Sequence, residues 1–128
     1  MTQIRDIAGA GTIKDQIKAA IGVHGMWKTH IRSAAQTGSS EWKPDFVSSS
    51  HNCDFGKWLD SFPEGARNDV YKNVFGLHAQ FHKEAARALS LALNGQKEAA
   101  EKAISLGSDY EKMTMTLTKA MMDWLNKA

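Results

Sequence analysis

Apolar residues recur at steps of three and four through most of this chain of 128 residues. Such steps place side chains on one face of an α-helix, and three segments maintain them over several turns. We therefore predict long amphipathic helices over residues 12–36, 66–93 and 96–126. No stretch alternates with the period of two that marks a half-buried strand. The three stripes consist of Ile13, Ile17, Ile21, His24, Trp27 or Lys28 and Ile31; Val70, Val74, Leu77, Phe81, Ala85, Ala88 and Leu91; and Ala99, Ala103, Leu106, Tyr110, Met113, Leu117, Ala120 and Trp124.

Glycine and proline positions predict where these helices stop. Gly38 lies in a Thr-Gly-Ser-Ser run that is typical of a helix end, and Asn94-Gly95 ends the second long helix. Pro63-Glu64-Gly65 separates that helix from the segment before it. Gly107 interrupts the last stripe at a cost of about 1 kcal/mol relative to alanine, which predicts a kink or a close helix contact there.

The connection of residues 37–52 is the least regular part of the chain. It holds three consecutive serines and is predicted to be a loop with at most a short turn. A short helix follows from Cys53 to about Phe62, with Ser50 or Asn52 as its N-terminal cap.

Helices with one apolar stripe each bury those stripes most directly against one another, as an antiparallel bundle. The length suits a single domain over residues 1–128. Residues 1–11 form either a flexible start or an extension of the first helix, because Ile4 and Ile7 also have helical spacing.

Composition and charge exclude several classes of function. Hydrophobic residues make up 42% and charged residues 23%, as in ordinary globular proteins, and the net charge of +2 is too small and too mixed for nucleic acid or membrane surfaces. No apolar run approaches the roughly 18 residues of a membrane span. The first residues lack the pattern of a signal peptide, and a single cysteine suits a reducing compartment, so we expect a cytoplasmic location.

The candidate chemistry centres on the only cysteine, Cys53, because all five histidines lie within thirty residues of it. His78 and His82 are four residues apart, so a helix places both imidazoles on one face, within reach of one ion. His24 lies on the apolar stripe of the first helix. Each histidine alone is as well explained by packing in the core, but three inward-facing imidazoles and one thiolate form a donor set that suits tetrahedral zinc.

Three motifs carry a resemblance to a known family. His24-Gly25-Met26-Trp27-Lys28, Cys53-Asp54-Phe55-Gly56-Lys57-Trp58-Leu59 and His78-Ala79-Gln80-Phe81-His82 resemble, in order and rough spacing, the motifs of the chemoreceptor zinc-binding (CZB) domain family. The cysteine motif is the most specific of them. The resemblance implies that His24, Cys53, His78 and His82 bind one zinc ion. It also implies an all-α, mostly antiparallel four-helix bundle, often dimeric, with a short extra helix that carries the cysteine.

Members of that family regulate bacterial chemoreceptors and diguanylate cyclases, and some respond to oxidants through the zinc-bound cysteine. The resemblance therefore implies a regulatory domain that signals zinc level or thiol oxidation. A structural zinc site that supports dimerisation is the alternative. No output domain is recognisable in the sequence, so we expect either one domain of a longer protein or a chain that acts on a separate partner.

A metalloenzyme is the least favoured interpretation. Catalytic zinc keeps a position open for water and has a general base nearby, whereas four protein ligands leave no open position. Among the remaining histidines, His51 lies two residues before Cys53 and is a competing ligand candidate, although we expect it to be exposed in a loop. His30 lies about 240° around the helix from His24 and is expected at the surface.

Overall fold

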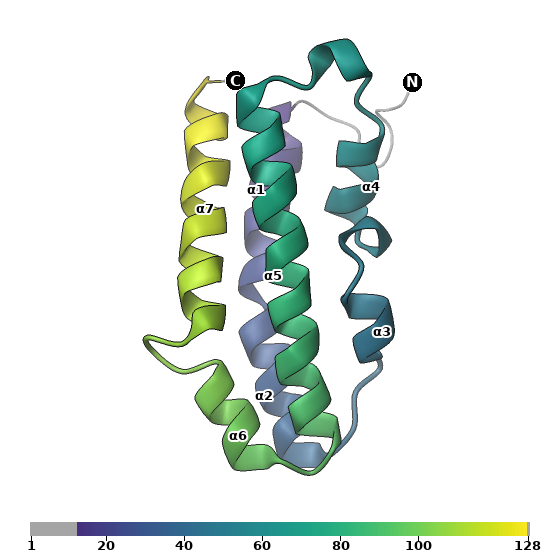
Figure 1. Ribbon diagram of the computed structural model, residues 1–128, viewed down its shortest axis with the longest axis vertical. Helices are drawn as coiled ribbons and strands as arrows, with labels where there is room; N and C mark the ends of the chain where they lie inside the picture. Colours follow the sequence, from purple (N-terminus) through teal and green to yellow (C-terminus); the bar gives the residue numbers. More distant parts are fainter. Residues whose placement is uncertain (1–12, 128) are drawn as a thin grey trace.

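Over residues 13–127, which the computed structural model describes, the chain is built from helices and contains no strand. The helices form four columns along the long axis (Figure 1). The predicted start over residues 1–11 lies outside the described residues. In chain order, the columns hold α1 (Ile13–Gly25) and α2 (Trp27–Thr37); α3 (Pro44–Val47), the 3₁₀ turn η1 (Ser50–Asn52) and α4 (Asp54–Asp60); α5 (Asp69–Leu93), preceded by η2 (Glu64–Ala66); and α6 (Lys97–Ala103) with α7 (Asp109–Lys127).

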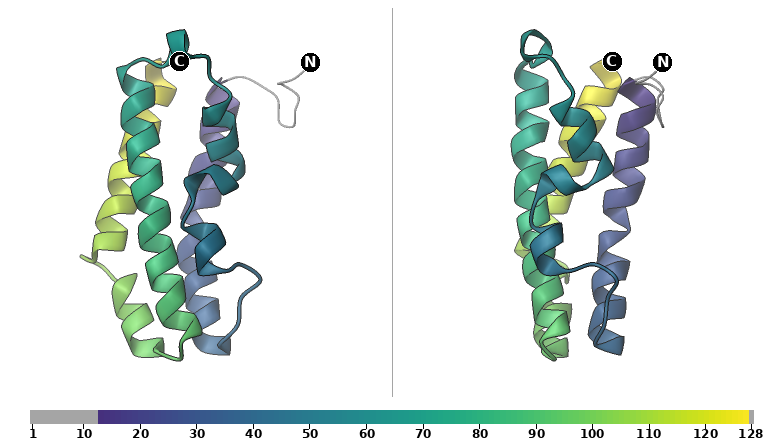
Figure 2. Two further views of the ribbon diagram at one scale, coloured as in Figure 1. Left: turned by 45° about the vertical axis from the view of Figure 1, so that its right-hand side comes forward. Right: turned by 90° about the vertical axis from the view of Figure 1, so that its right-hand side faces the viewer.

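Consecutive columns run in opposite directions. In Figures 1 and 2 the first column and α5 descend, whereas the segment from α3 to α4 and the segment from α6 to α7 ascend. The predicted all-α class is confirmed, and the arrangement is consistent with a mostly antiparallel four-helix bundle. No helix within the described range is both long and apolar enough to cross a membrane.

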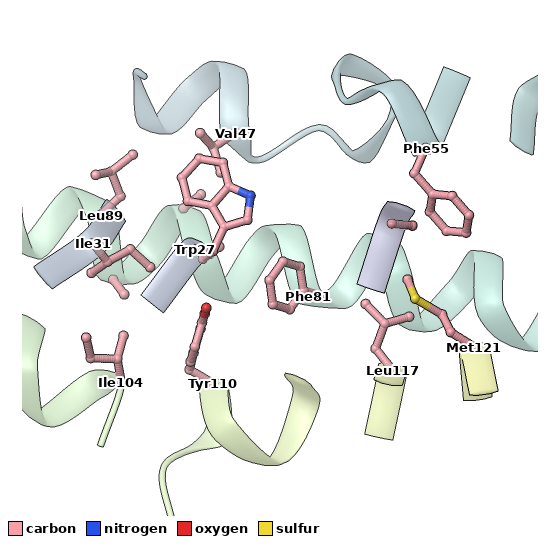
Figure 3. Close-up of a cluster of buried hydrophobic side chains, with 14 of the residues drawn as sticks. Trp27, Ile31, Val47, Phe55, Phe81, Leu89, Ile104, Tyr110, Leu117 and Met121 are labelled. Atoms are coloured by element: carbon pink, nitrogen blue, oxygen red, sulfur yellow. The ribbon is translucent and has the colours of Figure 1, made fainter. Parts of the chain in front are cut away.

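The core fills the space between the columns, and Figure 3 shows its central side chains converging from all of them. Burying one large aliphatic or aromatic side chain contributes roughly 1.5–3 kcal/mol, so these contacts supply most of the driving force for folding. The largest fully buried apolar side chains are Ile17, Ile31, Leu59, Val74, Phe81, Leu89, Ile104, Leu117 and Met121.

The first predicted helix, residues 12–36, is interrupted at Met26. The Met26 amide donates to the Val23 carbonyl at 3.2 Å, three residues back rather than four. Gly22 and Gly25 precede this point and have low helix propensity, which weakens the ladder locally. The His30 amide donates to the Met26 carbonyl at 3.1 Å and restores the normal pattern. In Figure 2, α1 and α2 consequently follow one another in the same column.

The prediction of a single continuous helix over residues 96–126 was wrong. The segment is broken between α6 and α7, where Gly107 has a φ of +82°. The Ser108 hydroxyl accepts from the Glu111 amide at 3.1 Å, and the Glu111 carboxylate accepts from the Gly107 amide at 3.0 Å. This reciprocal capping starts a new helix at Asp109. Leu106, predicted on the buried stripe, is instead 85% exposed.

The irregular connection contains more structure than predicted. It includes α3 and η1, and neither Ser50 nor Asn52 caps the cysteine helix. Cys53 itself takes the N-cap position, with its sulfur accepting from the Gly56 amide at 3.4 Å. The α5 helix starts three residues later than predicted and ends, as predicted, at Asn94-Gly95.

Candidate metal centre

Four side chains converge between the first three columns. Their metal-binding atoms all lie within 4.8 Å of one another, and they belong to His24, Cys53, His78 and His82. The Nε2 atom of His78 is central, at 2.9 Å from Nε2 of His24 and 3.0 Å from Nε2 of His82. The sulfur of Cys53 lies 3.3 Å from Nε2 of His78 and 3.9 Å from Nε2 of His24.

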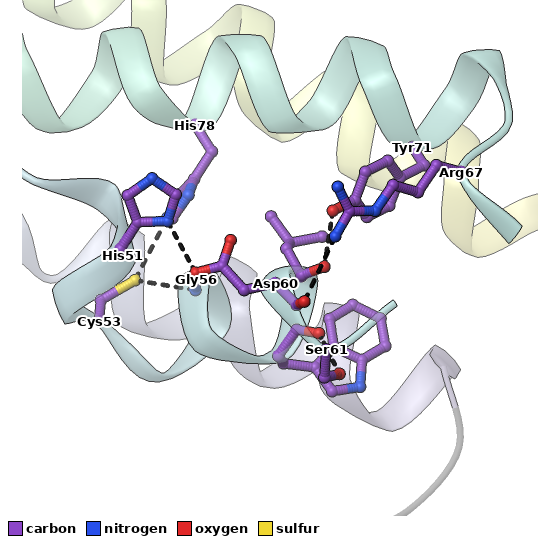
Figure 4. Close-up of polar contacts among 10 residues, drawn as sticks. His51, Cys53, Gly56, Asp60, Ser61, Arg67, Tyr71 and His78 are labelled. Atoms are coloured by element: carbon purple, nitrogen blue, oxygen red, sulfur yellow. Dashed lines mark hydrogen bonds and ion pairs between the residues drawn. The ribbon is translucent and has the colours of Figure 1, made fainter. Parts of the chain in front are cut away.

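Each side chain reaches this point from a defined place in a helix. His78 and His82 project from one face of α5, one turn apart, as their spacing predicted. His24 is the penultimate residue of α1, on the stripe that faces the core. Cys53 caps the start of α4, and Figure 4 shows its sulfur turned towards His78. The structure therefore brings together all four residues that the sequence singled out.

Two backbone carbonyls orient two of the imidazoles. Nδ1 of His24 lies 2.7 Å from the Ala20 carbonyl oxygen, and Nδ1 of His82 lies 2.9 Å from that of Val47. Because a carbonyl only accepts, each Nδ1 carries the proton, and in the neutral ring Nε2 is then an unprotonated acceptor. Both unprotonated Nε2 atoms point towards the same centre.

Without a cation, the protons available at this centre are one on Nε2 of His78 and the one on the Cys53 thiol. His78 donates its Nε2 proton to only one of its two histidine neighbours, so the other nitrogen depends on the thiol, a weak donor whose sulfur lies 3.9 Å from Nε2 of His24. A cation at the centre satisfies all three nitrogens and the sulfur. Around tetrahedral zinc the donors lie about 3.3 Å apart between nitrogens and about 3.6 Å apart between nitrogen and sulfur, given bond lengths of about 2.0–2.1 and 2.3 Å. Four of the six donor pairs differ from these values by a few tenths of an ångström, and the other two lie within 4.8 Å, so the donor types and their convergence fit zinc.

Burial favours the neutral form of all four candidate ligands. It lowers the pKa of His24 to about 4 and that of His78 to about 2, and it lowers the pKa of His82 as well. All three imidazoles are therefore neutral at pH 7. Burial raises the pKa of the Cys53 thiol, partly opposed by the hydrogen bond from Gly56. Cys53 therefore releases a proton when a cation binds, because a coordinated sulfur is a thiolate.

The depressed histidine pKa values predict that the metal-free protein loses stability in mild acid. The unfolded chain binds protons as the pH falls through about 6.5, whereas folded His24 and His78 bind them only at much lower pH. Each such histidine then costs up to about 1.4 kcal/mol of unfolding free energy per pH unit below 6.5. Urea unfolding of chelator-treated protein between pH 7.5 and 5 measures this slope. An unfolding free energy that stays constant over this range contradicts it.

Other contacts hold α4 in place. The Tyr71 hydroxyl donates to the Leu59 carbonyl, and Nη2 of Arg67 donates to the Asp60 carbonyl at 3.3 Å, so the end of α4 is tied to α5 and the residues just before it (Figure 4). His51, the competing ligand candidate, lies outside the cluster. Its side chain is 57% exposed, with Nδ1 2.7 Å from the Asp60 carboxylate.

His30 is only half-buried, and its ring lies against Trp27 and Trp42, with centroids 5.3 and 4.4 Å away. The surface position predicted for it is therefore correct only in part. The sequence interpretation also missed the carbonyls of Ala20 and Val47. Backbone groups have no residue-specific signal, so only the fold reveals which carbonyls face the histidines.

Comparison with known proteins agrees with this geometry. A family model described as the chemoreceptor zinc-binding domain matches residues 24–89, just over half of the chain. The match begins at His24 and includes Cys53, His78 and His82. No curated protein and no solved structure matches the chain. The predicted resemblance is confirmed, and the cofactor is zinc. The chain belongs to the chemoreceptor zinc-binding domain family.

Proposed function

We propose that His24, Cys53, His78 and His82 together bind one zinc ion per chain. The convergence of three buried imidazole nitrogens and one sulfur within 4.8 Å of one another carries this proposal. Bound zinc supplies a positive charge that links three separate columns of the bundle. The bundle positions the ligands, and Cys53 contributes the softest of them.

The site serves regulation rather than catalysis. Four protein ligands complete a tetrahedral zinc shell and leave no position for the water that catalytic zinc sites retain. Among the four ligands, Cys53 alone is partly exposed, and it lies on the short α4, whereas the histidines are buried on longer helices. Cys53 is therefore the ligand most free to leave the site, and its sulfur is the donor that oxidants attack most readily.

The signal is a rearrangement of the bundle that follows zinc loss or oxidation of Cys53. The family places such domains with chemoreceptors. We infer a cytoplasmic domain that acts, as a homodimer, on a chemoreceptor or a diguanylate cyclase, either in the same polypeptide or as a separate partner. A structural zinc site that only supports dimerisation is the competing function.

One experiment separates the two functions. Zinc content, helix packing by near-UV circular dichroism and oligomeric state are measured on the purified protein, after chelation and after treatment with hypochlorous acid. A sensor is expected to change its packing or its association when zinc is removed or Cys53 is oxidised. A chain whose packing and association stay the same, with only a lower unfolding temperature, has a structural site.

A further inference from the structure

The one-turn helix α3 has an unusual set of hydrogen-bond partners. A helix leaves its last four carbonyls without partners inside the helix. In α3 each of the four carbonyls accepts a hydrogen bond, the first from the backbone amide of the C-cap residue and the other three from side chains. The Ser48 amide donates to Pro44 and the Ser48 hydroxyl to Asp45, both at 2.8 Å. The Asn52 side chain donates to Phe46 and His82 to Val47, both at 2.9 Å.

Two of these partners belong to the metal centre or adjoin it. Asn52 directly precedes Cys53 in the chain, and His82 is one of the converging histidines. Their hydrogen bonds end on the neighbouring carbonyls of Phe46 and Val47. The short helix α3 packs against α5, which carries His82, and it lies below the cysteine segment in the same column (Figure 1).

The Asn52 side chain has no other role in this region. It does not cap α4, since Cys53 occupies that position, and its own amide donates to the Ser49 carbonyl. The amide group of the side chain reaches six residues back to α3 instead. Two other contacts join this segment to α4, the His51–Asp60 pair and the packing of Ser50 against Gly56, whereas the Asn52 side chain joins it to α3.

We propose that Asn52 is a positioning residue that, through α3, fixes Cys53 relative to His82. The proposal deepens the proposed zinc site and rests on the ligand set given there, but it does not depend on a sensory role. Its consequence is coupling: displacing the cysteine segment disturbs α3 and, with it, the carbonyl that orients His82. The positions of Cys53 and His82 therefore become less fixed together.

Asn52→Ala, which removes the donor, and Asn52→Asp, which replaces it with an acceptor, test the proposal. Asn73→Ala and Asn73→Asp are the matched controls, because Asn73 is exposed on α5, away from α3. Three quantities are measured: zinc affinity by chelator competition, the rate at which Cys53 reacts with a thiol reagent in metal-free protein, and the NMR signal of the His82 Nδ1 proton. That signal is identified by its loss in His82→Gln.

Both Asn52 variants are expected to bind zinc roughly tenfold more weakly, as for other groups that orient a ligand. Cys53 is expected to react severalfold faster, and the His82 proton to exchange faster with water. A purely structural hydrogen bond would lower the unfolding temperature without changing the His82 signal. An unchanged His82 signal in both variants therefore overturns the proposal. If the wild-type protein binds no zinc, the proposed ligand set fails. The rate of the Cys53 reaction and the His82 proton signal, both measured on metal-free protein, still decide the role of Asn52.

Discussion

Gly56→Ala is expected to destabilise the protein and to weaken zinc binding strongly. A β-carbon at this position would lie 1.7 Å from the carbonyl oxygen of Ser50 and 2.7 Å from its carbon. Both are backbone atoms, so no side-chain rotation relieves the overlap, and α4 must move away from η1. Overpacking of this kind costs about 1–3 kcal/mol or more. The displacement carries Cys53 with it, because its sulfur accepts from the Gly56 amide.

The measurements are the unfolding free energy in urea and zinc affinity by chelator competition. Gly76→Ala is the matched control, since Gly76 also lies within a helix and a β-carbon there meets nothing within 4 Å. That variant is expected to gain about 0.5–1 kcal/mol, because alanine is the better helix former. Gly56→Ala protein with the stability and zinc affinity of the wild type would show that α4 and η1 are not in contact in solution.

Zinc is expected to raise the unfolding temperature of the wild-type protein by more than about 10 °C. A ligand that binds only the folded state contributes about 4.1 kcal/mol when its free concentration is 1,000 times its dissociation constant. For a domain of this size, each kcal/mol corresponds to a few degrees. The proposed ligand set accounts for an effect of this size, because its residues come from α1, α4 and α5. Thermal unfolding with excess zinc and with excess chelator gives the difference.

In the Cys53→Ala variant, zinc is expected to raise the unfolding temperature far less than in the wild type, whereas the helix content is expected to stay the same. Only one ligand is removed, and the buried core contacts of α1, α5 and α7 remain. His51→Ala is the control, because His51 lies two residues away but outside the cluster. A Cys53→Ala protein that zinc stabilises as much as the wild type would contradict the proposed ligand set.

The metal centre was largely predictable because its residue types are rare and their local geometry is simple. His78 and His82 need only a helix to share a face, and the periodicity of that segment predicts one. Cys53 is the only cysteine. The apolar stripe around His24 indicates that it faces inward. None of these observations gives the distances between segments, which depend on how the columns pack.

The helix breaks were less predictable because they depend on competition between local signals. The last stripe continues through Leu106, yet α6 ends at Ala103 and Ser108 and Glu111 form a cap that starts a new helix. Their spacing is a known signal for a helix start, and the stronger periodicity masked it. The break at Met26 has flanking glycines as a signal, but glycine within a helix does not always interrupt it.

The sequence alone determined the helical class, the inward faces of the long helices and the donor set for zinc, because all of these follow from residue type and local spacing. Tertiary structure decided that α3 lies beside His82, that the Val47 carbonyl orients that imidazole, and that Gly56 packs against Ser50. Each of these contacts includes a backbone atom, from a segment far apart in the chain or in an adjoining turn. Backbone groups are the same at every residue, so only packing of the whole bundle selects which of them meet.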